Sequence, residues 1–328
     1  MSSQIEGLVP GDKLDSLNRA KRLEMWSLFF LLTIVVLLGM TMGMSQAMKA
    51  MWLEDLLSLI PSSAALVGIY LRYWEPNGAF NYGYHRGVQI GFLAAAVALF
   101  GFGVYLIIDS VYNLLIGYHP TIQTIEMFGT RVWLGWVMIG ALIYSVIPPM
   151  VLGQMKKPLA SELHDKTLYT SATIDKGDWL AGLAGILGIL GIAFGYWWAD
   201  SVAAGLIALE ITKDGVVNLK NSVFQLMNMR PTDVEAKQLD PINEKVENEI
   251  RSLPWIREAA VRLREDGPII AGEAMVVPAD ESDLISKLAE AGDRVKNLDW
   301  RIQDFNVVPV RSLDGNAAVK VKSRAAGQ

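Results

Sequence analysis

A series of long apolar segments constrains this chain more than any other feature of its sequence. The first runs from Trp26 to Ser45 and contains no charged residue. An α-helix needs about 20 apolar residues to cross the ~30 Å hydrocarbon core of a bilayer, so this segment is long enough to span a membrane. Further segments of comparable length follow at about 50–73, 88–115, 132–152, 167–196 and 200–219. The sequence therefore predicts an all-α membrane domain of six transmembrane helices.

The composition supports a membrane protein that also has a soluble part. Hydrophobic residues make up 52% of the 328 residues, charged residues make up 19%, and the mean hydropathy is +0.30. These values exceed those of an ordinary soluble domain. The net charge of −5 argues against nucleic acid as a partner, since that requires a basic surface. No cleavable signal peptide is expected, because the first apolar run is too long for one.

The basic residues predict the orientation of the chain. Most of them fall on one side of a six-helix topology: Lys21, Arg22, Arg72, Arg86, a basic loop with Lys156, Lys157 and Lys166, then Lys220 and Arg230. The loops on the other side hold little beyond Lys49 and Arg131. By the positive-inside rule both termini are cytoplasmic, and we expect a multi-pass protein of the inner (plasma) membrane.

Prolines and glycines give two further expectations about the helices. Pro148 and Pro149 in the fourth span should kink or end that helix. The fifth span has glycines every three or four residues, a spacing that favours close helix packing. These are Gly182, Gly185, Gly188, Gly191 and Gly195.

The composition changes beyond Arg230, where charged residues become frequent and long apolar runs end. A helix is expected at 234–252, two strands at 256–264 and 269–277, a second helix at 282–295 and a last strand at 300–310. The order αββαβ predicts a small α+β, ferredoxin-like domain. The chain would then consist of a cytoplasmic segment 1–24, a transmembrane transport domain 25–222 and a cytoplasmic dimerisation or regulatory domain 223–328.

Ionisable residues inside the apolar segments are the candidate functional groups. Asp175 and Asp178 lie on one face of the fifth span, with Ser171 one turn earlier. Charged groups are costly in a membrane, so they usually face a cavity, a partner or an ion. The alternative is structural: Lys176 and a neighbouring helix would neutralise the pair.

In the same way, Glu210 in the sixth span is either a ligand or proton carrier, or pairs with Lys213 one turn away. Asp109 in the third span is expected to face water.

Metal chemistry would have to rest on oxygen atoms. The chain has no cysteine and only three histidines, so thiolate sites are excluded and a buried imidazole site is not expected. Carboxylates, hydroxyls and carbonyls suit Mg²⁺, Mn²⁺ or Fe²⁺, although zinc also binds carboxylates. Pro61 would free a backbone carbonyl as another oxygen ligand. The candidate metal ligands are Asp178, Asp175, Glu54, Asp55, Ser58, Ser62 and Glu210.

Several of these features together resemble the cation diffusion facilitator family. The segment 82–86, Tyr-Gly-Tyr-His-Arg, is similar to the family's Tyr/Phe-Gly-His-x-Lys/Arg before the third span. Asp178 matches the aspartate of the family's His-x-x-x-Asp, while Asp200 and Asp214-Gly215 resemble positions at the two ends of the sixth span. The resemblance implies a homodimeric exporter of divalent metal that usually exchanges the metal for protons. It implies neither enzymatic activity nor a tightly bound cofactor.

The chain also departs from the family's pattern. Ile174 stands where the family usually has histidine. The family's second span usually offers Asp-x-x-x-Asp, and here two alignments compete: one places Glu54 and Ser58 at the ligand positions, the other Leu57 and Pro61. We therefore expect a divergent subgroup with an all-oxygen metal site between the second and fifth helices.

Two functions from different classes follow from this pattern. The first is a secondary-active exporter of Mn, Fe, Mg or Zn ions, working as a metal/proton antiporter in the lipid membrane. The second is a non-transporting membrane scaffold or metal sensor with a degenerate site. A channel is disfavoured, because the acids cluster at one depth rather than in successive rings. The C-terminal domain is expected to dimerise without tight metal binding, with Glu258, Glu273 and Asp304 as weak candidates.

Overall fold

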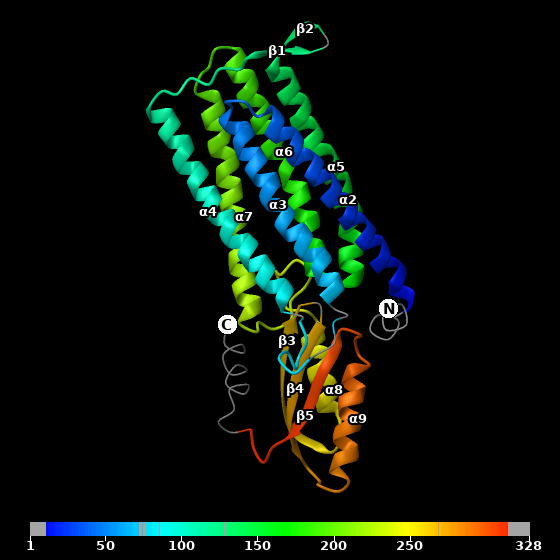
Figure 1. The fold of residues 1–328 in the computed structure, drawn as a ribbon. Helices are drawn as coiled ribbons and strands as arrows, with labels where there is room; N and C mark the ends of the chain where they lie inside the picture. Colours follow the sequence, from blue (N-terminus) through cyan, green and yellow to red (C-terminus); the bar gives the residue numbers. More distant parts are fainter. Residues whose placement is uncertain are drawn as a thin grey trace. The chain divides into compact units, whose positions relative to one another are not determined.

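The computed structural model describes residues 11–71, 74, 77–84, 86–127, 129–267 and 269–313. Within these ranges the side chains of residues 12, 61, 65, 68–71, 127, 167 and 174–178 are not described. The chain divides into two compact units (Figure 1). One, here called the bundle, comprises Asp15–Trp74 and Gly87–Val223. The other, here called the αββαβ unit, comprises Met1–Leu14, Glu75–Arg86 and Phe224–Gln328.

Long helices build the bundle (Figure 1). They are α2 (Gly11–Thr41), α3 (Gln46–Leu71), α4 (Gly87–Leu115), α5 (Leu134–Leu163), α6 (Lys166–Ala193) and α7 (Ala199–Leu226). Among the described residues, three helices are long and apolar enough to cross a membrane by length and composition: Lys13–Thr41, Gly87–Leu115 and Leu134–Leu163. A shorter apolar stretch, Trp179–Ala193, lies in α6. The other helices, α3, α6 and α7, are those that carry the candidate acidic residues.

Helix α2 begins well before the first apolar run. Its buried positions continue at helical spacing into the polar segment, where Leu17 and Ala20 are buried like Leu31 and Ile34 further along. One face of the helix is therefore buried in the bundle from Leu17 onward. The apolar run alone marks only part of this helix.

Helix α5 continues through its prolines. Pro148, Pro149 and Pro158 all lie inside the helix, which ends only at Leu163. Of the two outcomes expected for Pro148 and Pro149, a kink or the end of the span, the second is therefore wrong. The turns beyond them are held by burial, because Lys156 and Ala160 are completely enclosed by the bundle.

The glycines of α6 allow the close packing that their spacing predicts. A Cβ atom at Gly182 or Gly185 would touch Val146 or Leu142 of α5. A Cβ atom at Gly188 or Gly191 would collide with alanine Cβ atoms of α7. Gly195 plays another role, because it lies just past the helix with φ +87°, a conformation that favours glycine.

A short hairpin lies between α4 and α5 and was not predicted. Strands β1 (Thr124–Met127) and β2 (Thr130–Trp133) pair in antiparallel fashion. Each strand has only four residues, too few for an alternating pattern to stand out in the sequence.

The αββαβ unit has the predicted order of elements. They are α8 (Ile242–Ser252), β3 (Ile256–Asp266), β4 (Ile269–Pro278), α9 (Leu284–Lys296) and β5 (Ile302–Pro309). The sheet order is β3-β4-β5, with β3 antiparallel and β5 parallel to the central strand. Val246 and Ile250 of α8 and Val295 of α9 join the sheet residues in one apolar core. Helix α8 begins later than expected, because the preceding segment forms a turn closed by the Thr232–Leu239 bridge.

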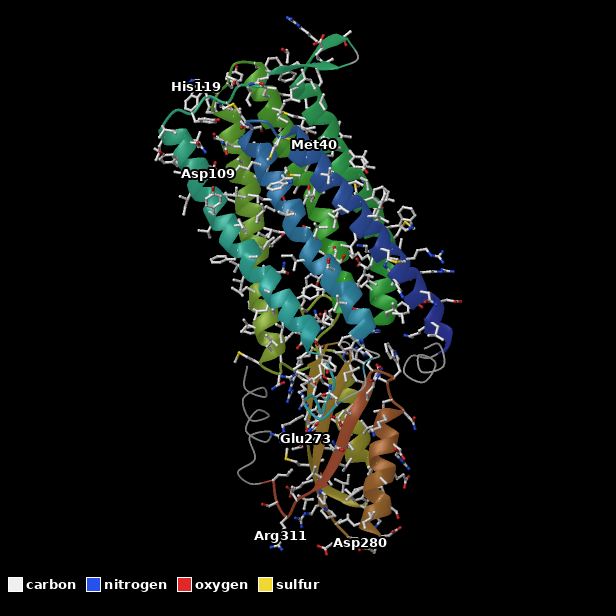
Figure 2. All side chains as sticks on the ribbon, in the orientation of Figure 1. Met40, Asp109, His119, Glu273, Asp280 and Arg311 are labelled. Carbon is white, nitrogen blue, oxygen red and sulfur yellow. The ribbon has the colours of Figure 1, made fainter. Side chains whose placement is uncertain are left out.

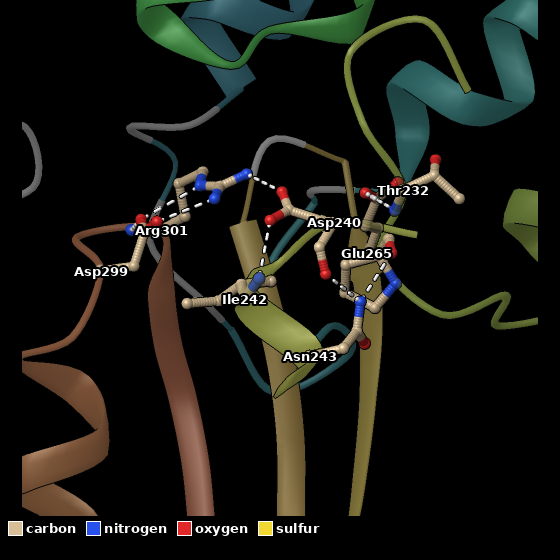
Figure 3. A network of polar contacts seen from close by, with 8 residues as sticks. Thr232, Asp240, Ile242, Asn243, Glu265, Asp299 and Arg301 are labelled. Atoms are coloured by element: carbon tan, nitrogen blue, oxygen red, sulfur yellow. Dashed lines mark hydrogen bonds and ion pairs between the residues drawn. The ribbon is translucent and has the colours of Figure 1, made fainter. Parts of the chain in front are cut away.

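A buried ion network fixes the start of α8 (Figure 3). The guanidinium of Arg301 donates to Asp240 at 2.9 Å and to Asp299 at 2.8 and 3.0 Å. The other carboxylate oxygen of Asp240 accepts the backbone N–H of Ile242 at 2.9 Å. Burial alone would lower the pKa of Arg301, but the hydrogen bonds and charges of Asp299 and Asp240 outweigh it and raise that pKa. The network is thus saturated with partners of opposite charge.

Candidate functional site

Helix α3 presents a buried polar stripe. Glu54, Asp55, Ser58 and Ser62 are all buried inside the bundle, although they lie in an otherwise apolar helix. The hydroxyl of Ser58 donates to the backbone carbonyl of Glu54 at 3.0 Å. Its oxygen lone pairs remain available as acceptors or ligands. The α3 candidates therefore lie inside the bundle and not against lipid.

Glu54 is the most exceptional of these residues. Its Oε2 atom is buried, and no described residue offers it a hydrogen bond. Among the described residues, the charges that act on Glu54 are negative and come from the neighbouring Asp55 and from Glu210 and Asp214 of α7. A buried carboxylate without a donor or a positive partner is expensive to maintain. As far as its side chains are described, the arrangement lacks a positive charge, which a cation or a proton would supply.

Helix α7 contributes two acids to this region. Glu210 and Asp214 are four residues apart, so they share one face of the helix. Lys213 acts electrostatically on both, but no ion pair joins it to Glu210 among the described side chains. Sequence reasoning had noted Asp214 only as a family-like position. Its spacing from Glu210 was the signal that could have included it.

The two acids proposed on α6 lie in the part whose side chains are not described. Asp175 and Asp178 belong to the helical backbone of α6, and the same holds for Ile174 and Lys176. His85, before the third span, also falls outside the described residues. Among the described residues, no three His, Cys, Asp or Glu side chains form a group that could hold a metal ion.

Lys156 is not in a loop, contrary to expectation. It lies in α5 and is completely buried, with its Nζ atom 3.4 Å from Oε2 of Glu24 in α2. The same ammonium donates to the hydroxyl of Ser171 in α6 at 2.9 Å. One lysine therefore connects α2, α5 and α6 in a buried network. Glu24, expected in a polar cytoplasmic segment, is equally buried.

Polar contacts also join helices near the start of α3. Asp200, in the first turn of α7, accepts hydrogen bonds from Ser45 and from the backbone at the beginning of α3. Lys49 of α3 forms an ion pair with Asp109 of α4 at 3.0 Å. Asp109 (Figure 2) was expected to face water, and this was wrong: its side chain is 24% exposed and bound to lysine.

The acids proposed in the αββαβ unit have partners within that unit. Glu273 of β4 is paired with Arg262 on the adjacent strand β3, and Glu258 lies 3.9 Å from Arg257. Asp304 accepts a long hydrogen bond of 3.4 Å from Asn306. These residues form local surface pairs, with no cluster among the described residues that would hold a metal.

Comparison with known proteins gives one match. A family model described as the cation efflux transmembrane domain matches residues 25–227. This range contains the candidate acids of α3, α6 and α7, the Lys49–Asp109 pair and Lys156 with Ser171, while Glu24 lies just before it. None of the curated proteins compared with the sequence matches it.

Proposed function

Because this chain belongs to the cation efflux family, we propose that it is a secondary-active exporter of divalent metal that exchanges the metal for protons. Membership of the family makes it an integral membrane protein that transports metal cations, and it agrees with the resemblance to the cation diffusion facilitators. The proposal goes further, because it assigns the ion, the mechanism and the residues.

The observation that carries the proposal is the buried carboxylate of Glu54. It has an oxygen atom without a hydrogen-bond donor among the described residues, and the negative charges of Asp55, Glu210 and Asp214 act on it. In a cation transporter, a transient metal ion is the natural partner for such a group. The buried carboxylate of Asp200 differs, because donors bind both of its oxygens.

The proposed site lies between α3 and α6, which pack against each other. Its ligands would be Glu54, Asp55, Ser58 and Ser62 from α3, with Asp175 and Asp178 from α6. Glu210 of α7 would add charge from the side. All of these ligands are oxygen donors, which suit Mn²⁺, Fe²⁺ or Mg²⁺ and permit Zn²⁺.

Proton coupling follows from the same chemistry. Metal binding keeps carboxylates deprotonated, and protons can replace the metal as the neutralising charge. If the site opens alternately to each face of the membrane, the exchange couples outward metal flux to inward proton flux. The proposal includes six spanning helices, cytoplasmic termini and a homodimer formed with the αββαβ unit.

The test is transport by the purified protein in proteoliposomes. We expect saturable uptake of Mn²⁺, Fe²⁺, Mg²⁺ or Zn²⁺ accompanied by a change of lumenal pH. Asp178→Ala should reduce uptake to background without preventing membrane insertion, while Glu126→Ala, at an exposed acid of the β1–β2 hairpin, should transport normally. Metal binding without flux in the unsubstituted protein would overturn the exporter and indicate a sensor or scaffold. Full uptake by Asp178→Ala would remove Asp178 from the site.

A further inference from the structure

Asp200 makes more hydrogen bonds than a helix-terminal acid needs. It lies in the first turn of α7 and is completely buried. Its Oδ1 atom accepts from the hydroxyl of Ser45 at 2.6 Å and from the N–H of Ala47 at 3.3 Å, and Oδ2 accepts from the N–H of Gln46 at 2.6 Å. Both carboxylate oxygens are therefore bound to the N-terminus of a different helix, α3.

The contact is a cap supplied by one helix to another. The first N–H groups of a helix have no partner within the helix, and that end carries partial positive charge. Ser45 already caps α3 locally, because its Oγ atom accepts the N–H of Met48 at 3.1 Å. The carboxylate from α7 adds a charge-assisted link to this local cap. The link fixes α3 and α7 to each other at their beginnings.

This link places the acids of the two helices at a similar depth. Glu54 follows Gln46 by eight residues, and Glu210 follows Asp200 by ten. At 1.5 Å per residue, the two carboxylates lie about 12 and about 15 Å along their helices from the link. Helices α3 and α7 start at the same end of the bundle (Figure 1), so the two acids are nearly level. The electrostatic interaction of Glu54 with Glu210 and Asp214 agrees with this placement.

We propose that Asp200 is a positioning residue for the cation site: by binding the start of α3, it sets the depth of Glu54 relative to Glu210 and Asp214. The inference rests on the proposed function, since it assumes that these acids bind the cation. Asp200 itself does not act as a ligand, because N–H and O–H donors occupy both of its oxygens. A metal ion there would have to displace the helix start.

The experiment compares Asp200→Asn with the unsubstituted protein in full-length form. Mn²⁺ affinity is measured by electron paramagnetic resonance in detergent, together with the half-saturating concentration and maximal rate of Mn²⁺ transport in proteoliposomes. The asparagine amide keeps one acceptor and replaces the other with a donor, so the link is weakened but not removed. We expect the Mn²⁺ affinity to fall about tenfold, which corresponds to ~1.4 kcal/mol, with a smaller fall for Ser45→Ala.

Two further variants separate positioning from general stability. Asp109→Asn breaks the Lys49–Asp109 pair between α3 and α4 and leaves α7 untouched, so it should lower the melting temperature without changing Mn²⁺ affinity. Glu210→Gln removes the acid that Asp200 aligns, so Asp200→Asn should cost little further affinity in that background. Unchanged Mn²⁺ affinity in Asp200→Asn, or a full tenfold loss that persists in the Glu210→Gln background, would overturn the inference.

These outcomes are distinct from failure of the proposed function. If the unsubstituted protein binds Mn²⁺ but shows no flux, the exporter is wrong, while the affinity measurements still test Asp200. If it binds no Mn²⁺, the same series is measured with Mg²⁺ and Zn²⁺ by calorimetry. Absence of binding for all three ions would overturn both proposals.

Discussion

The two units of this protein treat a buried charge in opposite ways. In the αββαβ unit, Arg301 lies between Asp240 and Asp299; its guanidinium makes three hydrogen bonds to their carboxylates, and its backbone N–H makes a fourth, to Asp299. In the bundle, Glu54 is buried with an oxygen that no described residue binds, and the charges around it are negative. The first arrangement is complete as folded and serves stability. The second is incomplete as folded, which is what a transient ion-binding group requires.

Buried acids within the bundle also differ in the partners that they have. Glu24 is paired with Lys156, and Asp200 is bound to the start of α3. An ammonium group faces Glu24, and N–H and O–H donors bind Asp200, so both acids connect helices, whereas the described charges that act on Glu54 are negative. Burial of an acid alone therefore does not identify a cation site; the nature of its partners decides. The predictions below test that rule.

The largest effect is expected at Glu54. Glu54→Gln keeps the size of the side chain and removes its charge, so metal transport should fall at least ~100-fold, given that loss of a group merely supporting a metal ligand costs 10–100-fold. The metal-free protein should melt at the same or a higher temperature, because no partner loses its bond. Transport assays and thermal unfolding in detergent measure the two effects. A clearly lower melting temperature with intact transport would place Glu54 among the structural acids.

The next effect is expected at the buried pair of the bundle. Lys156→Met leaves Glu24 buried without its ammonium partner and should destabilise the protein by about 3–5 kcal/mol. The double variant Lys156→Met/Glu24→Gln should recover most of this loss, because no uncompensated charge remains. Equilibrium unfolding in mixed micelles measures both. If the double variant is as unstable as the single one, the ammonium acts through something other than Glu24.

A comparable but more local loss is expected in the αββαβ unit. Arg301→Met leaves Asp240 without its guanidinium partner and should lower the free energy of unfolding by about 3–5 kcal/mol. The loss should be near the lower value, because Asp240 keeps its hydrogen bond to α8. Hydrogen exchange of the full-length protein should show faster exchange in α8 and β5 than in the bundle helices. Arg262→Met, which breaks an exposed pair with Glu273, is the matched control and should change little. Uniformly faster exchange across the chain would contradict a local role.

The smallest effect concerns pH and the exposed Asp280 of the αββαβ unit (Figure 2). Hydrogen bonds from the hydroxyl and N–H of Ser282, and then from Lys287, lower the pKa of Asp280. Because this pKa is lower in the folded protein, the ionised carboxylate of Asp280 stabilises the fold at pH values above its pKa in the unfolded chain, about 3.9. This contribution is lost as the pH falls through the pKa of the folded state. The unsubstituted protein should therefore melt at a slightly higher temperature than Asp280→Asn. This difference in melting temperature should be constant from pH 7 to about pH 4.5 and become smaller at lower pH.

The measurement is a melting series over pH for the unsubstituted protein and Asp280→Asn. Ser282→Ala removes the principal donor and should reduce the increment by itself. An increment that grows as the solution is acidified would have the wrong sign for a carboxyl with a lowered pKa.

Periodic features could be predicted well from the sequence, whereas contacts between side chains of different helices could not. Apolar segments and the αββαβ order follow from hydrophobic patterns of the chain itself, so they could be read directly. Lys156 was assigned to a loop because a lysine is normally exposed, and only the fold shows Glu24, 132 residues away, beside it. The same holds for Lys49 with Asp109 and for Asp200 with Ser45. Contacts between helices depend on packing that no local pattern encodes.

The candidate site shows both sides of this limit. Glu54, Asp55 and Glu210 stood out because acids are rare in apolar helices. The sequence could not predict that Asp214 acts on Glu54, because the relative depth of α3 and α7 is not encoded in either segment alone. Pro148 and Pro149 were expected to kink or end their helix, and the helix does not end there, because the turns that follow are held by burial.

The glycines of α6 have a mechanical consequence. Gly188 and Gly191 bring the backbone of α6 so near Ala203 and Ala199 of α7 that no methyl group fits between them. At this end of α6 and α7 there is no room for a larger side chain, so alanine at Gly188 or Gly191 should force the two helices apart. The glycines thus hold the end of α6 against the start of α7, where Asp200 binds α3.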